Sequence, residues 1–313
     1  MQCKKFIFLC LFLLLVSAVS TAVIYRKLKK IQTAIQITSV TNEESYFHLF
    51  NNRILNDRIN REEFIAKVAE EGGLQLEVGP YYRPVLKGEN VRYFDVLDKE
   101  GLIRKAKVDD VSIELIPEID YVEPYGDMSI IKDKFDLVFS SHNIEHQVNL
   151  VKHLQQVEEL LKTGGKFYLA APDKRYCFDH FTNLTPLSMV LAVYWEPPIQ
   201  HSLQTILSKC ESAHNGAKKH WRDESSVPLL IEDNSCFVTE YENYKRANGG
   251  YIDAHKWRFT PESFAGIINE LYRMNLISLK IEKIWNTAPN SHEFYVVLVK
   301  DLIGSAQNSG EVD

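Results

Sequence analysis

From Leu74 onward, short runs of β-branched and aromatic residues alternate with segments of helical periodicity. Strands separated by helical crossovers pair in parallel, so the pattern predicts an α/β fold with a mostly parallel sheet. Two closing strands joined by a short turn predict an antiparallel C-terminal edge. The expected strands are 74–79, 91–96, 119–122, 135–140, 166–171, 279–285 and 293–300, and the expected helices are 99–106, 150–162 and 261–274.

The N-terminal segment is the most apolar part of the chain. Residues 6–25 carry no charge, and a helix of about 20 residues spans the hydrocarbon core of a bilayer. We expect residues 1–30 to form a transmembrane helix, an uncleaved signal-anchor, although a cleaved signal peptide is the alternative. Basic residues after the run favour a cytosolic domain, whereas the sequon Asn183-Leu184-Thr185 leaves a lumenal location open.

The remaining boundaries follow from changes in composition. Residues 31–73 read as a polar stalk followed by a helix, with Asn60 as its N-cap and Phe64 and Val68 on its apolar face. Residues 74–302 form the main domain. Within it, residues 182–251 are too long and irregular for a plain crossover, and we expect a helical or irregular cap over the substrate. Residues 303–313 are expected to be a disordered tail.

Composition narrows the classes of function. The net charge is −6, and acidic and basic residues are interleaved along the sequence. This pattern predicts no basic face of the kind that binds nucleic acid, so we do not expect a nucleic-acid substrate. The five cysteines contain no CxxC pair and indicate neither a disulfide framework nor a zinc motif. We therefore interpret the cysteines as free thiols in a reducing compartment and expect no metal.

Two features suggest a nucleoside ligand. Gly79 follows the first strand, and Asp95 ends the second, 18 residues after Glu77. Ligands of open parallel sheets bind outside the carboxyl ends of the strands, where a glycine allows close approach and an acidic side chain can accept from ribose hydroxyls. A glycine turn and a strand-ending aspartate are also common without any ligand.

Five segments together carry a more specific signal: LQLEVGP, VRYFDV, YGDM, KFDLVFSSHNIEHQ and LLKTGGKFYLAAPDKR. In this order and spacing they resemble the motifs of class I S-adenosylmethionine-dependent methyltransferases, in particular those called type 11. The resemblance covers about residues 74–175 and implies a Rossmann-like fold with S-adenosylmethionine as cofactor. PDKRYCFDHF and DAHKWRFTPESF also resemble bacterial methyltransferases that act near polysaccharide synthesis.

The resemblance implies positions for the cofactor. It places Glu77 and Gly79 at the methionine and ribose side, Asp95 on the ribose hydroxyls and Asp127 beside the adenine amino group, with Ser141 and His142 facing the methionine part. One departure is the Pro80-Tyr81-Tyr82-Arg83 run where the family has further glycines. A ligand without a phosphate does not need a full glycine nest, so this departure argues more strongly against a nicotinamide cofactor.

Methyl transfer to oxygen gains from a general base of near-neutral pKa, for which histidine is suited. Residues expected after strands or in the insert are the catalytic candidates: His146, His180, His255 and Asp173. Each candidate also has a structural alternative. His146 can be a polar group in the first turn of a helix, Asp173 can belong to a charged surface loop, and His255 can be an ordinary hydrogen-bonded histidine.

The leading hypothesis is O-methylation of a glycan, a lipid-linked sugar or a small polar metabolite near a membrane. The first alternative is a membrane-tethered binding protein that keeps the fold without catalysis, since fold does not fix function. The second is a nicotinamide-dependent reductase, which the missing glycine fingerprint disfavours.

Overall fold

A computed structural model describes residues 57–212, 216–223 and 235–301. The predicted membrane segment, the stalk up to residue 56 and the tail from residue 303 lie outside these ranges. Within the described ranges, the search for a helix long and apolar enough to cross a bilayer finds none.

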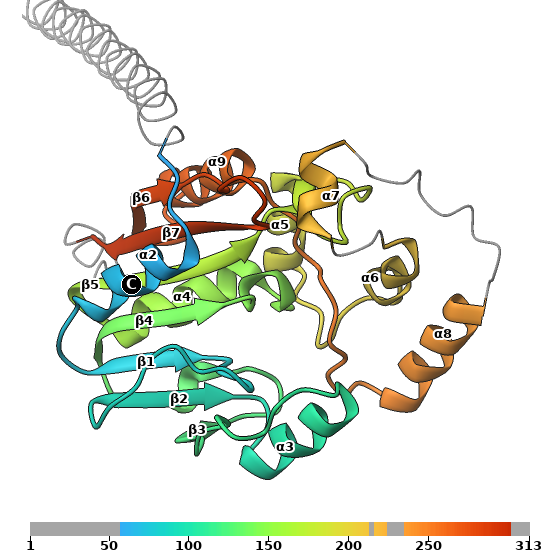
Figure 1. Ribbon diagram of the computed structural model, residues 1–313, viewed down its shortest axis with the longest axis horizontal. Helices are drawn as coiled ribbons and strands as arrows, with labels where there is room; N and C mark the ends of the chain where they lie inside the picture. The colour runs from blue at the N-terminus through green and yellow to red at the C-terminus, as the bar shows by residue number, and fades with distance from the viewer. Residues whose placement is uncertain (1–56, 213–215, 224–234, 302–313) are drawn as a thin grey trace, which may run out of the picture. The chain divides into compact units, whose positions relative to one another are not determined.

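Seven strands form one sheet in the order β3-β2-β1-β4-β5-β7-β6 (Figure 1). The first five strands are parallel, and β7 runs antiparallel between β5 and β6. The predicted parallel sheet with an antiparallel C-terminal edge is therefore confirmed, and the arrangement is Rossmann-like. The strands are β1 (Gln75–Val78), β2 (Val91–Asp95), β3 (Tyr121–Val122), β4 (Phe135–Ser141), β5 (Leu161–Pro172), β6 (Leu279–Trp285) and β7 (Glu293–Lys300).

The strand bounds agree with the sequence pattern except at β3 and β5. β5 begins at Leu161, where a helix was expected to continue, because Leu161 pairs with Phe135 across an irregular register. Gly164 then turns the chain at a φ of +73°, and regular pairing resumes at Lys166. The glycines therefore interrupt the start of a long strand instead of simply ending a helix.

Helix α2 (Arg61–Ala69) covers one face of the sheet. Asn60 and Glu63 form a reciprocal capping box that starts the helix, as the N-cap prediction required. The Phe64 and Val68 side chains are buried against alternate residues of β4, β5 and β7, and Phe64 stacks on Tyr295 with ring centroids 4.5 Å apart. The predicted apolar stripe is therefore a packing face.

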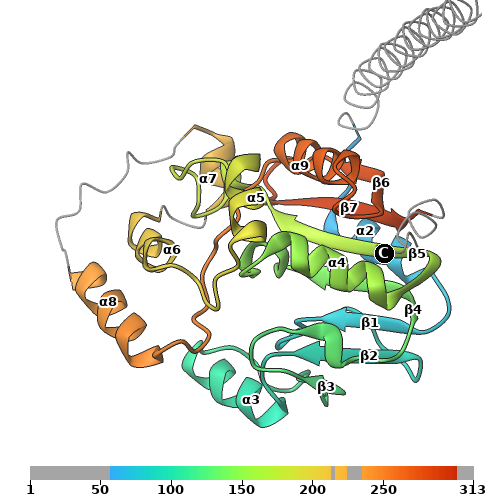
Figure 2. The ribbon, with the colours of Figure 1, turned by 180° about the vertical axis from the view of Figure 1, so that it is seen from behind.

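The opposite face is covered by α4 (Leu150–Leu160) and α9 (Pro261–Arg273) (Figure 2). Helix α3 (Lys99–Val108) lies near the β2 and β3 edge of the sheet. Phe264 of α9 meets Phe294 of β7, whereas the next residue, Tyr295, faces α2. This alternation shows that β7 is buried on both faces and explains its nearly continuous hydrophobic sequence.

The long insert contains helices that lie beyond the carboxyl ends of the strands in Figure 1. They are α5 (Leu187–Trp195), α6 (Leu203–Leu207), α7 (Ala217–Trp221) and α8 (Ser235–Ala247). Cys210 and Cys236 form a disulfide between the end of α6 and the start of α8, while Cys177 is free and buried. The interpretation of all the cysteines as free thiols is thus wrong for Cys210 and Cys236, because folding joins positions that spacing alone does not relate.

Replacing Phe64 by alanine should lower the free energy of unfolding by about 3–5 kcal/mol, because the ring is buried among aromatic side chains of the sheet. Urea unfolding of the full chain, followed by circular dichroism, measures the change. Glu62→Ala on the exposed side of the same helix is the control and should change the value by less than about 0.5 kcal/mol. A loss below about 1 kcal/mol for Phe64→Ala would contradict the assigned packing.

Candidate functional site

A cleft of about 590 Å³ lies at the carboxyl ends of β1, β2 and β4. This is the edge where open parallel sheets bind ligands. The segment that follows the insert forms another part of the wall. Among the residues that line the cleft are Gly79, Asp95, Gly126, His142, His146 and Asp253.

Gly79 turns the chain at the end of β1 with a φ of +70°. A Cβ added there would lie 2.7 Å from Asn143 Nδ2, so a larger residue meets both backbone strain and a close neighbour. The following Tyr81 and Tyr82 pack on the core next to α3, which accounts for the route of the loop without further glycines. Tyr81 also lines the cleft.

Asp95 ends β2 and lines the cleft beside Gly79. Its Oδ1 accepts a hydrogen bond from the backbone N–H of Leu97 at 3.1 Å. Burial raises the pKa of Asp95 to about 6, although backbone hydrogen bonds act in the opposite direction. The carboxylate is therefore charged at neutral pH and is available to accept from a ligand.

Three residues expected to hold the cofactor use their side chains elsewhere. The Glu77 carboxylate accepts from the backbone N–H groups of Val85 and Leu86, and burial raises its pKa to about 7. Asp127 caps a short 3-10 helix, and Ser141 Oγ accepts from Arg61. None of these three residues lines the cleft. Gly126, the neighbour of Asp127 in the chain, does line the cleft.

His142 follows β4 in a left-handed conformation with a φ of +50°, which is strained for a residue other than glycine. Its Nδ1 lies 3.5 Å from Glu145 Oε1 and its Nε2 lies 2.8 Å from Glu293 Oε1. Burial disfavours the protonated ring, but the two carboxylates outweigh burial and raise the pKa of His142 to about 10. His142 is therefore a cation that bridges two acids at the edge of the cleft.

The four catalytic candidates separate in space. His146 lines the cleft, and His255 packs edge-on against it with ring centroids 4.6 Å apart. Burial disfavours a charged His146, but its ion pair with Asp253 outweighs burial and raises the pKa of His146. The structure therefore brings His146 and His255 together.

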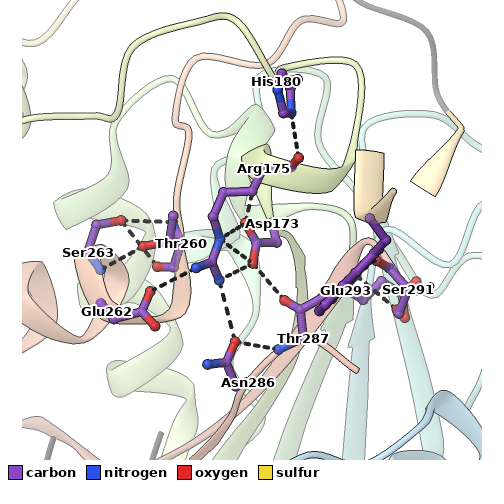
Figure 3. A network of polar contacts seen from close by, with 11 residues as sticks. Asp173, Arg175, His180, Thr260, Glu262, Ser263, Asn286, Thr287, Ser291 and Glu293 are labelled. Atoms are coloured by element: carbon purple, nitrogen blue, oxygen red, sulfur yellow. Dashed lines mark hydrogen bonds and ion pairs between the residues drawn. The ribbon is translucent and has the colours of Figure 1, made fainter. Parts of the chain in front are cut away.

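Asp173 and His180 lie away from this pair. Figure 3 shows Asp173 inside a polar network in which it accepts from Arg175 and from Thr287 Oγ1. His180 is bound through Nδ1 to the carbonyl oxygen of Arg175. Asp173 is fully buried and neither residue lines the cleft, so both have structural contacts in place of the catalytic contacts expected for them.

Three carboxylates that were not among the predicted site residues surround the histidine pair. Glu145 is completely buried, Asp179 is nearly so, and Asp253 is half exposed. The sequence did contain a signal for these carboxylates, because each of them stands one or two positions from a candidate histidine. Their convergence required the chain to return from the insert, which spacing does not reveal.

Residues 86–169 match the family described as a methyltransferase domain. The matched range includes β2, β4, α4 and most of β5, and it therefore contains Asp95, His142 and His146. The chain carries a class I methyltransferase domain. S-adenosylmethionine is accordingly its methyl donor.

Several solved structures resemble this methyltransferase. A Clostridium acetobutylicum S-adenosylmethionine-dependent methyltransferase is 11% identical, with 83% of this chain and 99% of that chain covered and a TM-score of 0.39. The CcbJ methyltransferase from Streptomyces caelestis is 12% identical, with coverage of 75% and 93% and a TM-score of 0.39. A Listeria monocytogenes protein described as a methyltransferase of this type is 13% identical, with coverage of 77% and 100% and a TM-score of 0.38.

At these scores the resemblances carry no argument about function. The search of curated proteins finds no match. The assignment therefore depends on the family match over residues 86–169.

Gly79→Ala should weaken binding of S-adenosylhomocysteine at least about tenfold, because a left-handed alanine costs about 1–2 kcal/mol and its Cβ would displace Asn143 at the cleft. Gly164→Ala is a matched control, since Gly164 has a similar φ of +73° with open space around its Cβ position. Calorimetry on the full chain should show unchanged affinity for that control. Equal loss in both variants would contradict the role of Gly79.

Proposed function

We propose that the methyltransferase transfers the methyl group of S-adenosylmethionine to a hydroxyl oxygen of a glycan, a lipid-linked sugar or a small polar metabolite. The supporting observation is the single cleft that joins a nucleoside-sized edge, with Gly79 and Asp95, to a histidine and carboxylate cluster. The acceptor oxygen forms a bond to the methyl carbon, the carbon–sulfur bond breaks with its electrons going to sulfur, and the hydroxyl proton leaves to water.

The cofactor takes the β1 and β2 side of the cleft in this proposal. Gly79 lets the backbone approach the ligand, and the Asp95 carboxylate accepts from both ribose hydroxyls. His142, held between Glu145 and Glu293, faces the methionine end. Its ring lines the cleft there, while its two nitrogens face the carboxylates.

The acceptor takes the side of the cleft formed by His146 and by the segment with Tyr251 and Asp253. Holding an oxygen nucleophile in line with the sulfonium methyl group is the main contribution that a methyltransferase can make. The polar, partly exposed walls at this end suit a hydroxylated acceptor better than an apolar one.

Labelled S-adenosylmethionine tests this proposal. The full chain should transfer label to a membrane or glycan extract and produce S-adenosylhomocysteine. A protein that binds S-adenosylhomocysteine by calorimetry but labels nothing in such extracts would instead support the catalytically inactive binding protein, which the altered glycine loop keeps as the alternative.

The affinity for S-adenosylhomocysteine should fall by about fivefold when the pH is lowered from about 7.5 to 5, because a neutral Asp95 loses about 1 kcal/mol of charge-assisted hydrogen bonding. The pKa of Asp95 is raised to about 6, so the carboxylate is protonated within this window and the charged form is lost as pH falls. Calorimetry at both pH values measures the change. Asp95→Asn should bind weakly at both values, and a steep pH dependence retained in that variant would contradict the assignment.

His146→Asn should lower kcat at least about a hundredfold and leave the affinity for S-adenosylhomocysteine within about threefold, because the acceptor hydroxyl loses a side chain that positions it in line with the methyl group. Steady-state kinetics and calorimetry measure the two effects. His180→Asn is the comparison, because His180 lies in the network of Figure 3, away from the cleft. A larger loss of kcat in His180→Asn than in His146→Asn would overturn this placement of the acceptor.

We also propose that residues 6–25 anchor the chain in a membrane with the catalytic domain on an oxidising side. The Cys210–Cys236 disulfide and the exposed Asn183 of the sequon favour that side, against the basic residues after the apolar run. Protease added to sealed vesicles should spare the domain. Complete digestion without detergent would place the domain in the cytosol.

A further inference from the structure

A buried carboxylate without a hydrogen-bond partner lies behind the cleft. Glu145 is completely buried, and neither of its carboxylate oxygens has a hydrogen-bond partner within the described residues. Such a group is costly unless something compensates its charge. Ring nitrogens of three histidines lie 3.5–3.8 Å from its Oε1.

The distances within this cluster differ from those of hydrogen bonds. His146 Nε2 lies 3.6 Å and His255 Nε2 lies 3.8 Å from Glu145 Oε1, beyond the range of an N–H···O bond. Ligands bound at about 2.0–2.2 Å in a tetrahedron around zinc are separated by roughly 3.4 Å. The three atoms all lie within 4.8 Å of one another and need only a small adjustment to share an ion.

Carboxylates also lie behind the two histidines. His255 Nδ1 is hydrogen-bonded to Asp179 Oδ2 at 2.6 Å, whereas His146 Nδ1 lies 2.8 Å from Asp253 Oδ1 as an ion pair without hydrogen-bond geometry. The carboxylate behind His255 fixes that ring and directs its free nitrogen, which is the arrangement found around histidine-bound metals. Arg258 in turn holds Asp179 at 3.0 Å.

We propose that Glu145, His146 and His255 bind one zinc-type divalent metal ion, with an open coordination position toward the cleft. Two imidazoles and one carboxylate are a donor set of catalytic zinc sites. His142 stays outside this ligand set, because its Nε2 is bound to Glu293, which Arg61 also contacts at 2.7 Å. The ion would compensate the buried charge of Glu145.

The role of the ion rests on the proposed function, although its binding does not. His146 and Asp253 line the acceptor end of the cleft, so an acceptor hydroxyl could occupy the open position. Coordination to a divalent ion lowers the pKa of a bound hydroxyl and orients its oxygen. The site would therefore select acceptors whose hydroxyl can reach the metal.

Metal binding to the full chain tests the proposal without any methyl transfer. Protein stripped with a chelator is titrated with Co²⁺, and one equivalent should produce the visible absorption bands of a low-coordinate site that Zn²⁺ then abolishes. Glu145→Gln and His255→Asn each remove a ligand and should weaken metal binding at least about a hundredfold. Asp179→Asn removes only the carboxylate that supports His255 and should weaken metal binding by about 10–100-fold. His180→Asn is the control and should bind as the native protein does.

Folded, stripped protein that gives no cobalt bands and no zinc uptake would overturn the proposal and leave a purely imidazolium–carboxylate cluster. Unchanged affinity in both ligand variants would do the same. If a variant does not fold, X-ray absorption of the native zinc complex decides, because it should show nitrogen and oxygen ligands at about 2.0–2.2 Å, whereas sulfur ligands would refute the site. Metal binding without methyl transfer would contradict only the proposed function.

Discussion

The site depends on how the segment after the insert is attached to the end of β4. The backbone carbonyl of Glu145 accepts from the N–H groups of both Lys256, at 2.9 Å, and Trp257, at 3.1 Å. The Lys256 Nζ and Trp257 Nε1 groups add bonds to the carbonyls of Val148 and Gln147, which are 108 and 110 positions away in the chain. These bonds hold His255 against His146, so the cluster exists only because the two segments are joined.

Burial then determines the chemistry of each charged group according to its partners. Asp95 has mainly backbone donors, and its pKa rises to about 6. The partly exposed His142 lies between two acids, and its pKa rises to about 10. His153, buried in α4, has no carboxylate to compensate it among its described contacts, and burial lowers its pKa to about 4. Three groups around one cleft thus differ because of the neighbours that the fold supplies.

Local pattern was sufficient for most of the fold, because periodicity and capping act within a few residues. The bounds of β6 and β7 match the pattern, and the Asn60 cap forms as its sequence indicates. Gly79 and Asp95 were expected at one edge because a parallel sheet gathers strand ends there, and both line the cleft. The disulfide, the buried network of Asp173 and the convergence on Glu145 join distant segments, and no local signal encodes such contacts.

The position of β7 has a consequence for how the domain is made. β7 is paired on both sides, by β5 and by β6, although it is the last strand in chain order. Until Lys300 has left the ribosome, β5 remains an open edge with unpaired backbone groups, and its apolar residues stay available to other chains. Synthesis of the final strand therefore closes the sheet, and it delivers Glu293 to His142 in the same event.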